Sequence, residues 1–302
     1  MDSYIENFLN FLAVEKGFSR NTVAAYRNDL QRLGDFLREN GHAFKEGLTW
    51  SQVHRNHIMD YILSLKDRQY SPATVARKVA AAKSFFNFLT AEGITRSNPT
   101  ENLDTPKVGK SLPKTLTIDE VDKLLEQPQM KDTPSARRDR AMLELLYATG
   151  MRVSELVGLN VEHVNLQTGN VRCFGKGMKE RILPIHNQAI QALHEYLSEG
   201  RPQLVQKPEE RALFVNQRGQ RLTRQGLWLI IKAYAQKANI KAAVTPHVLR
   251  HSFATHMLHR GTPLRNVQEF LGHANISTTQ IYTHLTDDYM HREYEKAHPR
   301  AK

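Results

Sequence analysis

The sequence lacks the features that would place it in a secreted, membrane or cysteine-metal class. Cys173 is the only cysteine in 302 residues, so neither an intrachain disulfide nor a cysteine-based zinc cluster can form. No run approaches the ~20 apolar residues of a membrane span, and residues 1–6 lack a basic region followed by an apolar core. We therefore expect a cytoplasmic protein without a membrane partner, in which Cys173 packs inside a strand.

Acidic residues are also few relative to basic ones. The chain has 31 Asp and Glu against 42 Lys and Arg, which gives a net charge of +11 and a pI near 9.7. Such an excess of positive charge is expected of a protein that binds nucleic acid, although a basic protein without that partner has the same composition.

Length and patterning predict two domains, because the chain exceeds the roughly 100–200 residues of a typical single domain. In residues 1–103, apolar residues recur at helical spacing, and Ser71 with Pro72 forms a helix start. The predicted helical segments are residues 5–12, 19–39, 50–65 and 71–89. We expect a four-helix domain, followed by a linker at residues 104–113, which hold two prolines and a glycine without a helical period.

Residues 114–302 are predicted to form the second domain. Thr117 and Glu120 make a capping box, and Gly150 can end a helix that spans residues 137–148. Strand character occurs at residues 170–174 and 180–185, which flank a Gly175-Lys176-Gly177-Met178-Lys179 turn. The expected fold class is mainly α with a small β-sheet, with a helical N-terminal domain and an α+β C-terminal domain.

The chemistry-bearing residues concentrate near the C-terminus, in the run His247-Val248-Leu249-Arg250-His251, in Leu271-Gly272-His273, and at Tyr282. A tyrosine hydroxyl, an arginine and imidazoles are the groups needed to attack a phosphodiester and stabilise the charge that develops. Arg152, after the predicted helix end at Gly150, is a second candidate because a guanidinium matches phosphate geometry. Glu155, one turn later, could orient a neighbouring basic side chain.

Each of these residues also has an ordinary interpretation. An arginine or a hairpin lysine such as Lys176 is usually a solvated charge, and a tyrosine between apolar residues is usually part of the core. His247 and Arg250 share a helix face and can meet one phosphate, whereas His247 with His251 would also suit a metal, although no third ligand is evident.

Together the motifs resemble the tyrosine site-specific recombinases, also called the phage integrase family. The resemblance rests on A-T-G-M-R-V-S-E-L at 148–156, the hairpin lysine, H-V-L-R-H at 247–251, L-G-H at 271–273 and the late tyrosine, and it covers nearly the whole chain. It implies a SAM-like core-binding domain followed by a tyrosine-recombinase catalytic domain. The implied catalytic residues are Arg152, Lys176, His247, Arg250, His273 and Tyr282.

The resemblance also implies the role of each residue. Arg152 and Arg250 would hold the non-bridging oxygens, with His273 beside them, while His247 would assist proton removal from Tyr282. Lys176 would protonate the leaving 5′ oxygen. The 3′-phosphotyrosyl link would conserve the energy of the cut bond, so that rejoining would need no cofactor, metal or ATP.

The segment 71–86 resembles the last helices of the core-binding domain, which makes Arg77, Lys78 and Lys83 candidates for DNA contact, against a solvated basic face as the alternative. Sequence details after Leu271 resemble the bacterial XerC/XerD type, which resolves chromosome dimers. The implied partners are a short inverted-repeat DNA site, a tetramer with identical or paralogous recombinases, and a septal DNA translocase. The tail after Tyr282 would dock on a neighbouring protomer, although packing in cis fits the stripe Met290, Tyr294 and Ala297 equally well.

Three competing functions remain at this point. A mobile-element integrase would use the same chemistry, and a type IB topoisomerase would share the pocket but relax supercoils without exchanging strands. An architectural DNA-binding module would bind DNA and never form a covalent adduct.

Overall fold

The computed structural model describes residues 2–39, 49–101, 103, 115–175, 180–272 and 287–301. The chain divides into two compact units, Met1–Ser111 and Leu112–Lys302. The predicted linker at 104–113 lies outside the described residues. Among the helices in the described ranges, none is both long enough and apolar enough to cross a membrane.

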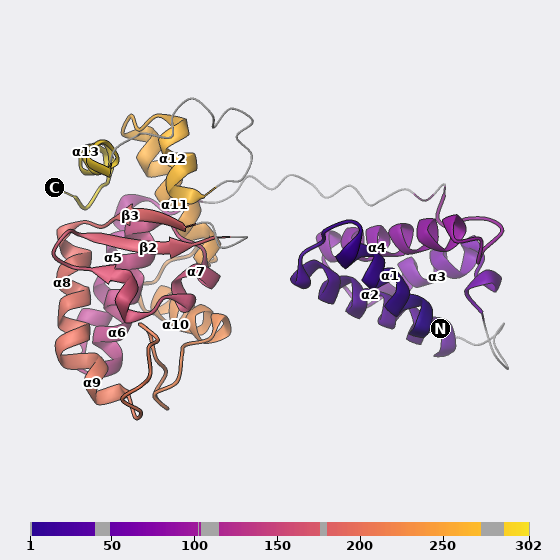
Figure 1. Ribbon diagram of the computed structural model, residues 1–302, viewed down its shortest axis with the longest axis horizontal. Helices are drawn as coiled ribbons and strands as arrows, with labels where there is room; N and C mark the ends of the chain where they lie inside the picture. The colour runs from indigo at the N-terminus through magenta and orange to yellow at the C-terminus, as the bar shows by residue number, and fades with distance from the viewer. Residues whose placement is uncertain are drawn as a thin grey trace. The chain divides into compact units, whose positions relative to one another are not determined.

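The N-terminal unit consists of helices (Figure 1) whose buried residues form one hydrophobic core. Its elements are α1 (Asp2–Val14), α2 (Arg20–Glu39), the 3-10 turn η1 (Trp50–Gln52), α3 (Arg55–Asp67) and α4 (Pro72–Ala91). Apolar residues at helical spacing on α1 are buried, and the Ser71 hydroxyl accepts from the Thr74 amide at 3.3 Å, as its capping position predicts. Four α-helices are therefore confirmed for this unit.

The predicted helix at residues 50–65 was wrong at its start. The side chain of Gln52 accepts from the Thr49 amide at 3.1 Å, and Nδ1 of His57 accepts from the His54 amide at 3.0 Å. Each bond satisfies a donor at a helix N-terminus, so the chain forms a short turn and then begins a new helix at Arg55.

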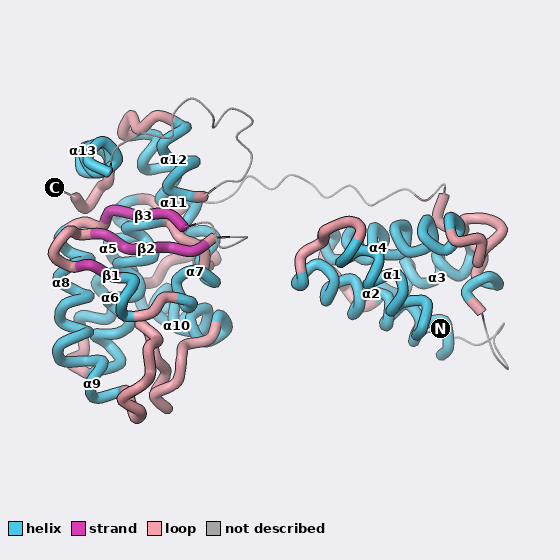
Figure 2. The backbone as a smooth tube through the Cα atoms, viewed as in Figure 1, coloured by secondary structure: helices cyan, strands magenta, loops and turns pink. Residues whose placement is uncertain are grey.

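The C-terminal unit is built around the buried helix α6 and a three-stranded antiparallel sheet (Figure 2). The elements before and in the sheet are α5 (Ile118–Glu126), η2 (Gln127–Met130), α6 (Pro134–Thr149), α7 (Val153–Gly158), η3 (Val161–His163), β1 (Val164–Asn165), β2 (Asn170–Phe174) and β3 (Glu180–Pro184). After the sheet follow α8 (Asn187–Glu195), the π-helical turn η5 (Tyr196–Gly200), α9 (Arg201–Leu204), α10 (Arg224–Lys237), α11 (Pro246–His259), α12 (Leu264–Leu271) and α13 (Asp287–Ala297). The predicted fold class, mainly α with a small sheet, is confirmed.

The sheet has the order β1-β2-β3, and the two-residue strand β1 was missed because it is too short to show alternation. Cys173 on β2 is fully buried and lies opposite Arg181 on β3. The packing role predicted for this cysteine is therefore confirmed.

The end of the chain packs on its own catalytic unit. Tyr294 and Ala297 of α13 belong to the same apolar core as α6 and α11, and His298 is fully buried. The structure thus shows cis packing for two of the three residues in the tail stripe, while the side chain of Met290 lies outside the described residues.

Candidate active site

Arg152 is positioned by a sharp turn between α6 and α7. Gly150 ends α6 with a positive φ of 58°, and a Cβ there would lie 2.3 Å from a ring carbon of Phe253. Only glycine combines that backbone with that approach. The chain then places Arg152 at the N-cap of α7 with its side chain 43% exposed, where a ligand can reach it.

Glu155 is the anionic centre of the site, and its side chain is 4% exposed. It accepts from the Arg152 amide at 2.8 Å and from Nη1 of Arg152 at 3.1 Å. Arg181 donates to both carboxylate oxygens, at 3.2 and 2.7 Å. Burial alone would raise the pKa of Glu155, but the hydrogen bonds from Arg181 and Arg152 outweigh it and lower the pKa to about 2.

Arg250 enters the same site from α11. Its Nη1 donates to the Gly150 carbonyl at 2.8 Å, and its Nη2 donates to the Leu271 carbonyl at 2.7 Å. Arg152 donates to the same Leu271 carbonyl at 3.3 Å and to the Gly272 carbonyl at 3.4 Å. The two guanidiniums predicted from motifs 98 positions apart therefore converge on the C-terminal end of α12.

The electrostatics of this site favour an anion. Among the described side chains of the site, three arginines, Arg152, Arg181 and Arg250, lie around one carboxylate, that of Glu155, so positive charge is in excess there. Burial and then repulsion from Arg152 lower the pKa of Arg250 to about 10, so it stays charged at neutral pH. A phosphate would relieve this repulsion by accepting from both guanidiniums.

His247 stands in the first turn of α11, which Thr245 caps by accepting from the Val248 amide at 3.2 Å. His247 is exposed, whereas Arg250, one turn later, is partly buried in the site. His251 is also partly buried. Within the described ranges, no group of three or more His, Cys, Asp or Glu side chains is arranged to hold a metal ion.

Three of the predicted catalytic residues, Lys176, His273 and Tyr282, lie outside the described residues. Their flanks are described. Phe174 and Glu180 pair across β2 and β3 on either side of the Lys176 turn, and Gly272 caps α12 immediately before His273.

The three predicted DNA contacts on α4 differ in their surroundings. Lys78 is 3% exposed and its ammonium lies 2.9 Å from Asp29, which is equally buried. Arg77 also pairs with Asp29 but keeps its side chain 44% exposed, and Lys83 is partly buried. Burial is at odds with a DNA contact by Lys78, because a backbone phosphate cannot reach an ammonium enclosed with its own counter-ion.

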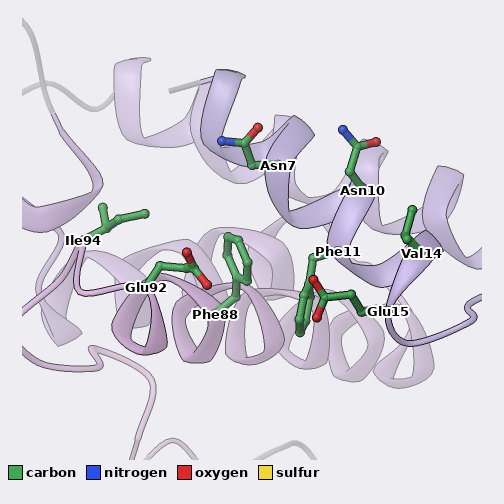
Figure 3. A pocket seen from close by; sticks show the side chains of 8 residues that line it. All are labelled: Asn7, Asn10, Phe11, Val14, Glu15, Phe88, Glu92 and Ile94. Carbon is green, nitrogen blue, oxygen red and sulfur yellow. The ribbon is translucent and has the colours of Figure 1, made fainter.

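A groove between α1 and α4 lies elsewhere on the N-terminal unit (Figure 3). The rings of Phe11 and Phe88 line it with centroids 5.1 Å apart and planes inclined by 41°, and Glu15 and Glu92 contribute carboxylates. The residues that line it are Asn7, Asn10, Phe11, Val14, Glu15, Phe88, Glu92 and Ile94. A lining with two carboxylates and no arginine or lysine does not suit a phosphate backbone.

Arg181 was missed by the motif analysis, although the sequence carried a signal for it. The arginine alternates in phase with the buried Leu183 on β3 and faces the buried Cys173 of β2. An arginine on the core side of a strand needs an internal counter-ion, and Glu155 is that counter-ion.

The comparisons with known proteins agree over both units. A model of the phage integrase family matches residues 114–288, and a model of the phage integrase N-terminal SAM-like domain matches residues 5–93. A tyrosine recombinase XerC from Herpetosiphon aurantiacus is 52% identical over 95% of this chain and 92% of its own length. A tyrosine recombinase XerD from Oceanobacillus iheyensis is 48% identical over 98% of both chains.

Solved structures show the same fold. XerA recombinase is 28% identical, with a TM-score of 0.50 over 98% of both chains. XerH recombinase bound to a palindromic difH substrate is 22% identical, with a TM-score of 0.67 over 97% of this chain and 94% of that one. With these likenesses and a family model that matches more than half of its length, the chain belongs to the phage integrase family and is a site-specific tyrosine recombinase of the XerC/XerD type.

Proposed function

We propose that the protein cuts one strand at a time through Tyr282 and rejoins it to a partner duplex by way of a Holliday junction. The convergence of Arg152 and Arg250 on the end of α12 carries this proposal, because two charged forks from distant segments face one small volume. An oxyanion held by both would be stabilised as charge builds in the transition state.

In the cleavage step, the phenolic oxygen of Tyr282 forms a bond to phosphorus while the bond from phosphorus to the 5′ oxygen breaks. His247 accepts the phenolic proton, and Lys176 supplies a proton to the leaving oxygen. Arg152, Arg250 and His273 hold the non-bridging oxygens. In the joining step a 5′ hydroxyl of the partner strand attacks the phosphotyrosine, and Tyr282 leaves as a phenol.

The biological substrate that we propose is a short inverted-repeat, dif-like site, at which a tetramer of identical or paralogous recombinases resolves chromosome or plasmid dimers in the cytoplasm. The XerC and XerD relatives and the difH-bound XerH support this assignment. We further propose that a septal DNA translocase activates the tetramer and that the segment 104–113 links the two DNA-binding domains around the duplex. No cofactor enters the proposed steps.

A suicide-substrate assay in EDTA tests the chemistry. A nicked duplex with a dif-like site traps the covalent intermediate, which is resolved from free protein on a denaturing gel. We expect an adduct with the wild type and none with Tyr282→Phe, which should bind the duplex equally well.

Tyr289→Phe is the matched control, and it should form the adduct at the wild-type level. Tyr294 is a poor alternative nucleophile because it is 1% exposed. Binding without an adduct, even when a partner recombinase is added, would support the architectural module instead, and persistent adduct in Tyr282→Phe would move the nucleophile elsewhere.

A further inference from the structure

Arg181 lies where three parts of the site meet. It is the second residue of β3 and stands five positions after Lys176 in the chain. Its side chain is 15% exposed and points into the unit opposite Cys173. The residue is therefore joined through the backbone to one proposed catalytic segment and through its side chain to others.

The guanidinium of Arg181 uses its donors on two separate segments. Nη1 and Nη2 donate to the two oxygens of Glu155 on α7, at 3.2 and 2.7 Å. Nε donates to the Phe270 carbonyl at the end of α12, at 3.1 Å. A single planar group thus connects β3, α7 and α12, which an ammonium could not do with the same geometry.

Gly272 provides a second contact with Arg181. A Cβ on this glycine would lie 3.0 Å from Nη1 and 3.1 Å from Cζ of Arg181, so the guanidinium packs directly against the Gly272 backbone. The carbonyl of the same glycine accepts from Arg152 at 3.4 Å, and His273 is the next residue in the chain.

We propose that Arg181 is a positioning residue for cleavage, which aligns Arg152 through Glu155 and fixes the end of α12 from which His273 follows. This inference rests on the proposed function. Arg181 itself donates inward to protein acceptors, and its effect on the phosphate passes through Arg152 and the α12 end. It also ties the strand that leaves the Lys176 turn to both of those groups.

The positioning role predicts a lower cleavage rate per folded molecule, which can be told apart from a loss of stability. Without Arg181, Glu155 loses the two donors that hold both of its oxygens, so the counter-ion of Arg152 is no longer fixed in place. Misplacement of a transition-state donor by about 1 Å costs on the order of 100-fold in rate. A purely structural arginine would lower the unfolding midpoint, yet the folded fraction would cleave at the normal rate.

The test measures single-turnover cleavage of a saturating suicide substrate together with the duplex Kd. We expect Arg181→Gln to cleave about 10- to 100-fold more slowly than the wild type, with a Kd within a factor of two or three. The cleavage rate of Arg181→Lys should lie between those of Arg181→Gln and the wild type, because lysine keeps the charge but lacks the forked guanidinium. Rates are divided by the folded fraction at the assay temperature, so loss of fold is not counted as loss of chemistry.

Arg172→Gln is the matched control, because Arg172 lies on the neighbouring strand and pairs with Glu180 at 3.1 Å with its side chain 56% exposed. It should cleave at the wild-type rate. A second readout is the acid side of the rate profile, which should move to higher pH in Arg181→Gln because Glu155 takes up a proton more easily and releases Arg152.

Wild-type rates per folded molecule and an unshifted acid limb in Arg181→Gln would overturn the positioning role. If Arg181→Gln does not fold, the same two measurements on Arg181→Lys decide. Failure of the proposed function looks different, because the wild type itself would then form no adduct at Tyr282.

Discussion

Two buried glutamates of the C-terminal unit, Glu155 and Glu144, each bind an arginine, yet their surroundings differ in charge and in access. Glu155 is shared by Arg152 and Arg181, with Arg250 close by, and the outer face of Arg152 is exposed. Glu144 binds Arg300 at 2.7 Å, and Arg300 also binds Asp122. Among the described residues, three cations lie around one anion in the first cluster, whereas in the second one cation, Arg300, binds two anions.

The cluster around Glu144, which we call the tail anchor, includes three stacked aromatic rings. It comprises Glu144, Asp122, His186, Tyr294, His298 and Arg300. His298 stacks between Tyr294 and His186, with ring centroids 4.8 Å from each. Burial and then repulsion from Arg300 lower the pKa of His186 to about 3, while burial raises the pKa of Glu144 despite Arg300.

The difference shows what each buried charge does. In the site around Glu155 the described arginines outnumber the carboxylate, and the exposed side chain of Arg152 can bind an incoming anion. In the tail anchor Arg300 is only 13% exposed and binds both carboxylates, which holds the end of the chain on α5 and α6. Buried ion pairs are thus evidence for an anion site only where cations are left in excess and one of them is exposed.

The largest expected effect is a loss of cleavage rate when the site around Glu155 is changed. Arg250→Ala should slow cleavage 100- to 1000-fold, because one charged donor to a transition-state oxyanion is worth roughly 3–4 kcal/mol. The single-turnover assay on a suicide substrate measures this rate. Arg201→Ala is the matched control, since Arg201 also caps main-chain carbonyls, at 2.6 to 3.1 Å, but outside the site. Equal losses in both variants would make the effect one of folding.

A substitution in the tail anchor should lower the free energy of unfolding. Arg300→Ala leaves Glu144 buried without its cation and should cost about 3 kcal/mol, because breaking a buried pair leaves an uncompensated charge. Urea denaturation measures it. Arg172→Ala, which removes an exposed ion pair with Glu180 on the sheet, should cost about 1 kcal/mol or less. Equal urea midpoints for Arg300→Ala and wild type would show that the anchor does not stabilise the unit.

The two clusters should lose their contributions to the free energy of unfolding in different pH ranges. The pKa of His186 is lowered from 6.5 to about 3, so its contribution to stability is complete above pH 6.5 and falls by about 1.4 kcal/mol per pH unit below it. His298, whose pKa burial also lowers, should add to the slope. Glu155, with a pKa lowered from 4.5 to about 2, loses its contribution only below pH 4.5.

The measurement is the urea midpoint between pH 7.5 and 5. His186→Asn keeps a side chain that can accept from the Ala189 amide, as His186 does at 3.2 Å, and it should remove part of the slope. A slope as steep as that of the wild type would show that His186 does not control the acid sensitivity of the anchor.

The smallest effect extends the comparison to the N-terminal unit, where Asp29 binds one exposed and one buried cation. Arg77→Ala should reduce the log-log salt slope of duplex binding by about 0.9, the value for one phosphate contact. Lys78→Met should leave the slope unchanged, because Lys78 is enclosed with Asp29. Filter binding between 50 and 200 mM salt tests both variants. A lower slope for Lys78→Met would show that Lys78 does contact DNA.

Local sequence determined most of the fold's boundaries. The Ser71–Pro72 start of α4, the Thr117 capping box and the Gly150 helix end were predicted because each depends on neighbours within four residues. The break between η1 and α3 was not predicted, since Gln52 and His57 bond the backbone in ways that helical spacing does not encode.

The sequence by itself also identified Arg152 and Arg250 as candidate groups of the reaction, because the motifs around them each stand in a short, recognisable run. Only the tertiary structure decided which groups share a counter-ion. Arg181, Glu155 and the end of α12 are far apart in the chain and meet only when β3, α7 and α12 pack together. The same reason applies to Lys78, whose counter-ion Asp29 lies in another helix, because local spacing can place a charge on the core side of an element but does not show which distant residue pairs with it.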